Sequence, residues 1–130
     1  MNVKRVQHVS IPIPEGGASS ARQFYGEVLG LTEKRVPHSL DAAMLTWFDV
    51  GSDEHELHCY VDDDFRNRST AQHLCFEVGD LAAIKQRIAE AGVQLEPEPI
   101  AIHNRPRAFV RDPFANLIEL TEIQGSFEEE

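Results

Sequence analysis

The same order of predicted elements occurs twice along this 130-residue chain, and that repeat limits the possible folds more than any other feature. One helix-like segment ends at Gly30 before Leu31, and a second ends at Gly92 before Val93. Each follows one strand-like segment and precedes three others. An internal repeat of this kind predicts two copies of one structural unit.

The first copy is predicted to be a strand, a helix and three further strands. The stretch KRVQHVSIPI alternates with the period of two typical of a strand and stops at Pro12 and Pro14. The apolar residues of the following segment have helical spacing, and Ser19 or Ser20 can cap its start; they are Ala21, Phe24, Tyr25, Val28 and Leu29. Strands are expected at 31–37, 43–50 and 55–61, with a hairpin turn at Gly51-Ser52-Asp53.

The second copy repeats this order after a polar linker at 63–70. The segment AQHLCFEV is the strand, Asp80 caps the helix, and a buried stripe runs along it; the stripe consists of Leu81, Ile84, Ile88 and Ala91. Strands are expected near 94–101, 106–111 and 116–123. The prediction is therefore one domain, 1–130, with a first module at about 3–62, a second at about 71–123, and an acidic tail at 124–130.

Composition limits the partners and the location. Twelve basic and 22 acidic side chains give a formal charge of −10, which disfavours nucleic acid and anionic membranes as partners. No apolar run approaches the roughly 20 residues that cross a bilayer, and the N-terminus lacks the pattern of a secretion signal. The chain is expected to be cytoplasmic, with Cys59 and Cys75 as buried, reduced thiols.

Four residues with side chains that bind metals occupy matching places in the two copies. His8 and His73 lie in the first strand of each copy, and His58 and Glu119 lie in the last. This pattern fits a single divalent metal site. His38, His55 and His103 are expected to be exposed, and Arg105 and Arg107 are either surface charges or contacts for an anionic substrate.

Three stretches carry a family resemblance: FYGEVLGL at 24–31, HLCFEVGDL at 73–81 and FVRDPFANLIEL at 109–120. With them the chain resembles the vicinal oxygen chelate superfamily, which includes glyoxalase I, bleomycin resistance proteins and extradiol dioxygenases. The last stretch is similar to the family's F-x-x-D-P-x-G-N-x-I-E-L signature, with Ala115 in place of the glycine. The resemblance implies an α+β fold in which two tandem βαβββ modules form a cupped, barrel-like mixed sheet around a metal.

The resemblance also implies ligands and partners. His8, His73 and Glu119 match the family's ligands, and His58 stands where glyoxalase I usually has a glutamate. The implied cofactor is one divalent ion per site, with Fe²⁺, Ni²⁺, Zn²⁺, Mn²⁺ and Co²⁺ left open. The implied partner is a small-molecule substrate, and small relatives suggest a homodimer. Glu119 is the expected proton-transfer residue; Glu56, on the same strand face as His58, is not expected to serve.

Three functions follow as expectations. The first is a metal-dependent enzyme with glyoxalase I-like lyase or isomerase chemistry on a small oxygen-rich substrate, independent of glutathione because Pro12 and Asp62 replace two expected contacts. The second is an extradiol-type Fe(II) dioxygenase using His8, His73 and Glu119, although Phe109 stands where a tyrosine is expected. The third is a metal-free binding protein of the bleomycin-resistance type.

Overall fold

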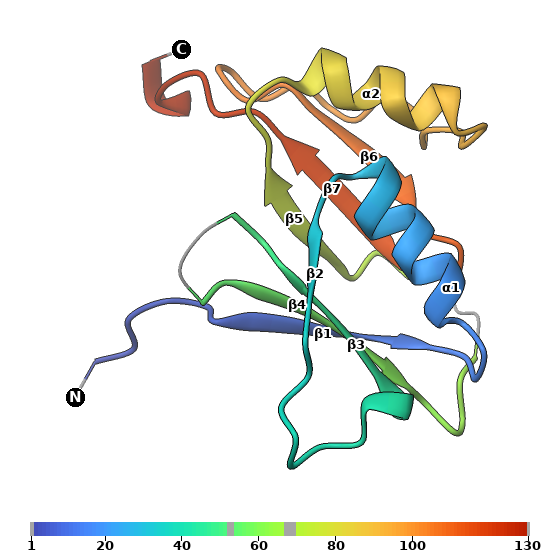
Figure 1. The fold of residues 1–130 in the computed structure, drawn as a ribbon. Coiled ribbons are helices and arrows are strands. Elements are labelled where there is room, and N and C mark those ends of the chain that lie inside the picture. Colours follow the sequence, from blue (N-terminus) through green and yellow to red (C-terminus); the bar gives the residue numbers. More distant parts are fainter. Residues whose placement is uncertain (1, 52–53, 67–69, 130) are drawn as a thin grey trace. The chain divides into compact units, whose positions relative to one another are not determined.

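The computed structural model describes residues 2–51, 54–66 and 70–129, which form two compact units at residues 1–67 and 68–130 (Figure 1). Part of the expected linker (67–69), part of the expected turn (52–53) and residue 130 of the tail lie outside the described residues. Each unit has its own sheet, with four strands in the first and three in the second. The predicted α+β class and the two-module order are confirmed.

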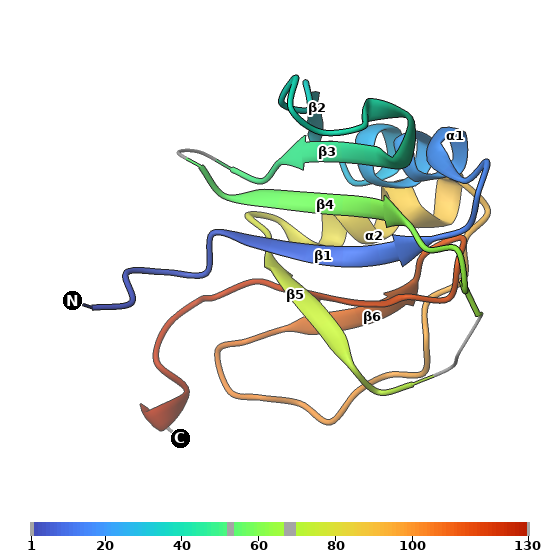
Figure 2. The same cartoon turned by 90° about the horizontal axis from the view of Figure 1, so that it is seen from below.

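The first unit consists of a mixed sheet, one longer helical segment and a short 3₁₀-helix. Its strands have the order β1-β4-β3-β2, and Figure 2 shows β1, β4 and β3 side by side. The β1–β4 pair is parallel, whereas the β4–β3 and β3–β2 pairs are antiparallel. The elements are β1 (His8–Ile13), α1 (Ala18–Ala21), η1 (Arg22–Val28), β2 (Thr32–Lys34), η2 (Ala42–Met44), β3 (Leu45–Asp49) and β4 (Glu56–Val61).

The two faces of this sheet differ because side chains alternate along a strand. Ile11, Phe48, Leu57 and Cys59 point to one face and are buried. Tyr25 of η1 packs against Phe48, with ring centroids 6.0 Å apart. The histidines of β1 and β4 therefore occupy the other face, away from the apolar core.

The first helical segment begins differently from the prediction. Gly17 is its N-terminal cap and no side chain caps it, so the expected capping by Ser19 or Ser20 is wrong. The segment continues as a π-helix, in which the Leu29 N–H donates to the carbonyl of Phe24, five residues earlier. The predicted buried face is correct for four of its five residues; they are Ala21, Phe24, Tyr25 and Val28.

The second unit has the strand order β5-β7-β6, with a parallel β5–β7 pair and an antiparallel β7–β6 pair. Asp80 caps its helix by accepting a hydrogen bond from the Ala83 N–H, as predicted. Of the predicted stripe, Leu81 and Ile88 are buried and Ile84 is half-buried, whereas Ala91 is exposed, so the prediction is wrong for Ala91. The elements are β5 (His73–Glu77), α2 (Leu81–Glu90), β6 (Arg107–Arg111), β7 (Leu117–Thr121) and η3 (Phe127–Glu129).

The strand expected near 94–101 is reduced to a single bridge between Leu95 and Val110. Pro97 and Pro99 explain the difference, because a proline has no N–H to donate to a neighbouring strand. The remaining predicted strands are present, although β2 is shorter than the expected 31–37. In the part of the chain that is described, no helix is long and apolar enough to cross a bilayer.

Candidate metal centre

His58 is the best-packed of the predicted ligands. It lies on the central strand β4 and is only 8% exposed. Its ring is stacked between Trp47 of β3, at a centroid distance of 3.6 Å, and His8 of β1, at 4.1 Å. The sheet of the first unit thus brings two predicted ligands together on one face.

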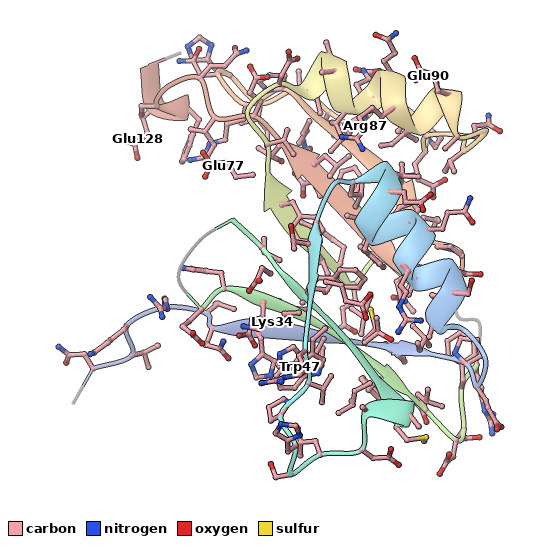
Figure 3. The ribbon with its side chains drawn as sticks, viewed as in Figure 1. Lys34, Trp47, Glu77, Arg87, Glu90 and Glu128 are labelled. Carbon is pink, nitrogen blue, oxygen red and sulfur yellow. The ribbon has the colours of Figure 1, made fainter. Side chains whose placement is uncertain are left out.

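A carboxylate and a lysine that the sequence analysis did not assign to the site hold His58 in place. Nε2 of His58 donates to Glu56 Oε1 (2.8 Å), and Lys34 Nζ forms an ion pair with Glu56 Oε2 (2.6 Å). The hydrogen bond from Lys34 lowers the pKa of Glu56 to about 2, so this carboxyl is ionised and can only accept. Lys34 also faces Trp47 across the β2–β3 pair (Figure 3).

These contacts determine which ring nitrogen of each histidine in the first unit carries the proton and which has the free lone pair. Burial lowers the pKa of His58, which favours the neutral ring; since Nε2 carries the proton, the lone pair is on Nδ1. Gln7 Nε2 donates to the carbonyl of Glu54, so the Gln7 amide oxygen faces His8 and accepts from its Nδ1 (2.7 Å). The lone pair of a neutral His8 is therefore on Nε2.

The second unit brings the other two predicted ligands into contact. His73 Nε2 lies 3.0 Å from Glu119 Oε1. The other ring nitrogen, Nδ1, is 2.8 Å from the carbonyl oxygen of Ala71 and must donate to it, because a carbonyl oxygen only accepts. In a neutral His73, the Nε2 lone pair would then face a carboxylate.

Two acceptors at 3.0 Å repel each other unless a cation or a proton lies between them. Two neighbouring ligands about 2.1 Å from one octahedral ion are also about 3.0 Å apart, so this spacing is compatible with a shared metal. The second carboxylate oxygen is already occupied, since Thr121 Oγ1 (2.9 Å) and Arg107 (3.4 Å) donate to it. Glu119 therefore directs Oε1, and only Oε1, towards His73.

The strand registers place His58 and Glu119 at equivalent positions. His58 lies opposite Ser10, two residues after His8, and Glu119 lies opposite Cys75, two residues after His73. Across the antiparallel pairs, Trp47 opposes His58 as Phe109 opposes Glu119. The internal repeat seen in the sequence is thus a repeat of strand register.

The donor set fits a divalent metal. Each of the three histidines donates one ring N–H to an oxygen and keeps the other nitrogen for a ligand, which is the usual arrangement of metal-binding histidines. Among the described residues, no three His, Cys, Asp or Glu side chains lie close enough together to hold one ion. Each unit supplies one pair, and the binding of a single ion by all four residues stays a prediction.

The other candidate residues are also placed. His38, His55 and His103 are exposed, as predicted. Neither cysteine forms a disulfide; Cys59 is buried, but Cys75 is exposed, so the expectation of two buried thiols is wrong for Cys75. Its strand β5 is an edge of the second sheet, paired on one side only in the described structure.

Comparison with known proteins places the chain in a family. The family model of the glyoxalase/bleomycin resistance protein/dioxygenase superfamily matches residues 5–120. The chain belongs to this superfamily. The match spans both units and includes all four predicted ligands.

Similar proteins carry several different names. A solved structure of a protein assigned to the glyoxalase family from Bacillus anthracis is 31% identical, covers 95% of this chain and 98% of its own, and has a TM-score of 0.85. The ethylmalonyl-CoA/methylmalonyl-CoA epimerase of Cereibacter sphaeroides is 26% identical over 93% of this chain and 99% of its own length. The fosfomycin resistance protein FosX of Listeria monocytogenes is 17% identical, covers 98% of both chains and shares the fold with a TM-score of 0.73.

Proposed function

We propose that this superfamily member is a metal-dependent enzyme of the lyase or isomerase type that moves a proton next to a carbonyl group of a small oxygen-rich substrate. The contact between His73 Nε2 and Glu119 Oε1 carries the proposal, because a lone pair facing a carboxylate at 3.0 Å needs a proton or a cation between the two atoms, and a divalent ion in that place would bind both. The similarity to an epimerase supports it, since epimerisation removes and returns a proton at one carbon.

His8, His58, His73 and Glu119 would hold the ion. A divalent metal with two open adjacent positions supplies Lewis-acid stabilisation of the oxyanion that forms when the proton leaves. Fe²⁺, Ni²⁺, Zn²⁺, Mn²⁺ and Co²⁺ all accept histidine and carboxylate ligands. The three histidines orient the site through their fixed ring N–H groups.

Glu119 would move the proton. It is the only carboxylate among the four residues, and a carboxylate is a common general base. Thr121 and Arg107 hold its Oε2, so Oε1 would have to leave the metal in order to accept the proton. Glu56 is a weaker candidate, because the pKa of about 2 that results from its pairing with Lys34 makes it a poor base.

Metal content tests the site directly. Protein purified without added metal or a polyhistidine tag should contain about one divalent ion per chain, measured by plasma emission. The His73→Ala variant should lose the ion, whereas the His38→Ala variant, which removes an exposed histidine, should keep it. Equal metal content in the parent and in His73→Ala would refute the metal site.

Activity tests the role of Glu119. Deuterium exchange into 2-branched acyl thioesters in D₂O, followed by proton NMR, detects proton removal without requiring a known product. Glu119→Gln should abolish exchange even when enough metal is supplied to fill the site, whereas His58→Glu should keep the metal. A fully active Glu119→Gln protein would contradict the proposal.

The proposed enzyme does not use glutathione, because Pro12 and Asp62 replace two expected contacts with it. Rapid turnover of the methylglyoxal–glutathione hemithioacetal would contradict this part of the proposal.

A dioxygenase is the second candidate, because two histidines and one carboxylate are the ligands of many non-haem Fe(II) oxygenases. Against it, Phe109 lies edge-on to His73 with ring centroids 5.1 Å apart and has no hydroxyl to offer at the position where a tyrosine is expected. Oxygen uptake with catechols after anaerobic loading with Fe(II) distinguishes the two enzymes. A protein that binds small molecules but takes up no metal would instead be of the bleomycin-resistance type.

A further inference from the structure

The second unit contains a cavity of about 330 Å³ that includes Glu119 but extends beyond the predicted ligands. Its polar wall includes Thr121, Arg105 and Arg107, and its apolar wall includes Ile102 and Ile123. This volume is at the small end of the range of ligand pockets. The cavity therefore suits a small molecule with both a polar and an apolar end.

The two arginines in this wall have different roles. Arg107 donates to Glu119 Oε2 (3.4 Å) and to the carbonyl oxygen of Ile100 (2.9 Å), so it belongs to the support of Glu119. The guanidinium of Arg105 stacks on Phe127, with Cζ 4.7 Å from the ring centroid. Within the described residues, the guanidinium of Arg105 has no hydrogen-bond acceptor or ion-pair partner, and its Nε is buried.

Burying a guanidinium N–H without an acceptor is energetically unfavourable, because the group loses its hydrogen bond to water and forms none with the protein. Stacking on Phe127 holds the Arg105 guanidinium by its flat face and leaves its in-plane donors available. These in-plane donors match the two oxygens of a carboxylate. An anion in the cavity would satisfy them.

The charges of the wall favour a carboxylate over a phosphate. The Nε of Arg107 also lacks an acceptor, but the charge of Arg107 is paired with Glu119. Among the described residues that line the cavity, Arg105 is therefore the arginine without an ion-pair partner, and Glu77 adds a second negative charge to the wall. A phosphate dianion would place two negative charges near two glutamates. A carboxylate has a single negative charge, which the Arg105 guanidinium alone can balance.

We propose that this cavity binds the carboxylate of a small branched organic acid through Arg105, with the alkyl part against Ile102 and Ile123. The proposal rests on the proposed function in one respect, since Glu119 is common to both. It then defines the substrate class: a short aliphatic carboxylic acid whose carboxylate lies beside the residue that moves the proton.

The test measures binding to chelator-treated protein, so that no metal contributes. Methyl NMR of protein with ¹³C-labelled isoleucine δ1 groups is followed during titration with isobutyrate, with the neutral isobutyramide as the matched ligand. Isobutyrate should shift the Ile102 and Ile123 signals and leave that of Ile11 in the first unit unchanged. Isobutyramide should bind at least tenfold more weakly.

Three variants and one competitor complete the test. Arg105→Gln should weaken isobutyrate binding at least tenfold, Arg105→Lys should fall between it and the parent, and Arg66→Gln, which removes an exposed arginine of the first unit, should bind like the parent. Equal binding of acid and amide, or parent-like binding by Arg105→Gln, would overturn the proposal, as would inorganic phosphate competing better than isobutyrate. Because these measurements need neither metal nor turnover, their failure would leave the metal and activity tests standing.

Discussion

Ala115 has a backbone conformation that favours glycine. It stands where the family signature has glycine, and its φ angle is +72°. The neighbouring Asp112 fixes this turn, because its Oδ1 accepts from the backbone N–H groups of Phe114 and Asn116, both at 2.9 Å. The turn leads directly into β7, which carries Glu119. Ala115 therefore stores backbone strain next to a strand of the candidate site.

Ala115→Gly should stabilise the protein. A left-handed residue with a Cβ costs about 1–2 kcal/mol, whereas the extra freedom of glycine in the unfolded chain costs about 0.4–1 kcal/mol. The net gain should be about 0.5–1 kcal/mol in the free energy of unfolding, measured by urea denaturation. Ala82→Gly, at an exposed helical position, is the control and should destabilise by about 1 kcal/mol. A destabilised Ala115→Gly protein would show that the turn is not strained.

Cys75 should be the only thiol that reacts in the native, metal-free protein, because it is exposed and Cys59 is buried. The residue is exposed as a whole, but its sulfur is partly removed from water, which raises the pKa of Cys75 above the ordinary 9.0, so less thiolate is present and the reaction should be slow. Its rate should continue to rise above pH 9, as measured with a chromogenic disulfide reagent. Cys75→Ser should remove the native-state reaction entirely; two rapidly reacting thiols would contradict the structure.

At the scale of elements, the start of α2 is tied to the end of β7. The Leu81 N–H donates to Glu122 Oε1 (2.8 Å), which gives an acceptor to one of the N–H groups that a helix leaves free at its start. Asp80 provides a second acceptor through the Ala83 N–H. The start of α2 thus has two caps. The sequence predicted the local cap, Asp80, but not Glu122, which follows the distant strand β7.

The cap from Glu122 should make stability depend on pH. The hydrogen bond from the Leu81 N–H lowers the pKa of Glu122 below its ordinary 4.5. The resulting stabilisation is present above the ordinary pKa and is lost as the pH falls through the folded-state pKa. Glu122→Gln should therefore lose less stability than the parent on acidification below pH 4.5, measured by denaturant unfolding at several pH values. Glu98→Gln, which removes an exposed carboxylate of the same unit, is the control; identical pH profiles for the two variants would contradict a role for this cap.

At the scale of the whole molecule, the predicted ligands are divided equally between two compact units. His8 and His58 lie in the first, and His73 and Glu119 lie in the second. A metal ion bound by all four residues would link the units thermodynamically, because it would bind the folded form of both and not the unfolded chain. The homodimer suggested by the family resemblance stays a prediction, which light scattering in solution tests.

Metal should therefore raise the unfolding temperature of the parent in a single transition. An ion at 100 times its dissociation constant contributes about 2.7 kcal/mol to the free energy of unfolding. His8→Ala, in the first unit, and His73→Ala, in the second, should each lose most of this shift in scanning calorimetry with and without metal. If one of these variants kept the full shift, the ion would be held by one unit alone.

The sequence by itself determined the order of elements, the two-unit repeat and the residues with ligand-type side chains. These features depend on residues that are close together in the sequence. Strands and helices show periods of two and 3.6 residues, Gly30 and Gly92 take the positive φ at a helix end, and Asp80 caps the helix that follows it. The positions of His58 and Glu119 in the repeat could be predicted for the same reason, since strand parity fixes which face a side chain occupies. The repeated strand register then confirmed that these two positions are equivalent.

Only the tertiary structure decided what those side chains contact. The pairing of Glu56 with both His58 and Lys34, the stacking of Trp47 on His58 and the unpartnered Arg105 beside Phe127 depend on segments that lie apart in sequence. Such contacts are set by register and packing between elements, and no local pattern of residues encodes them.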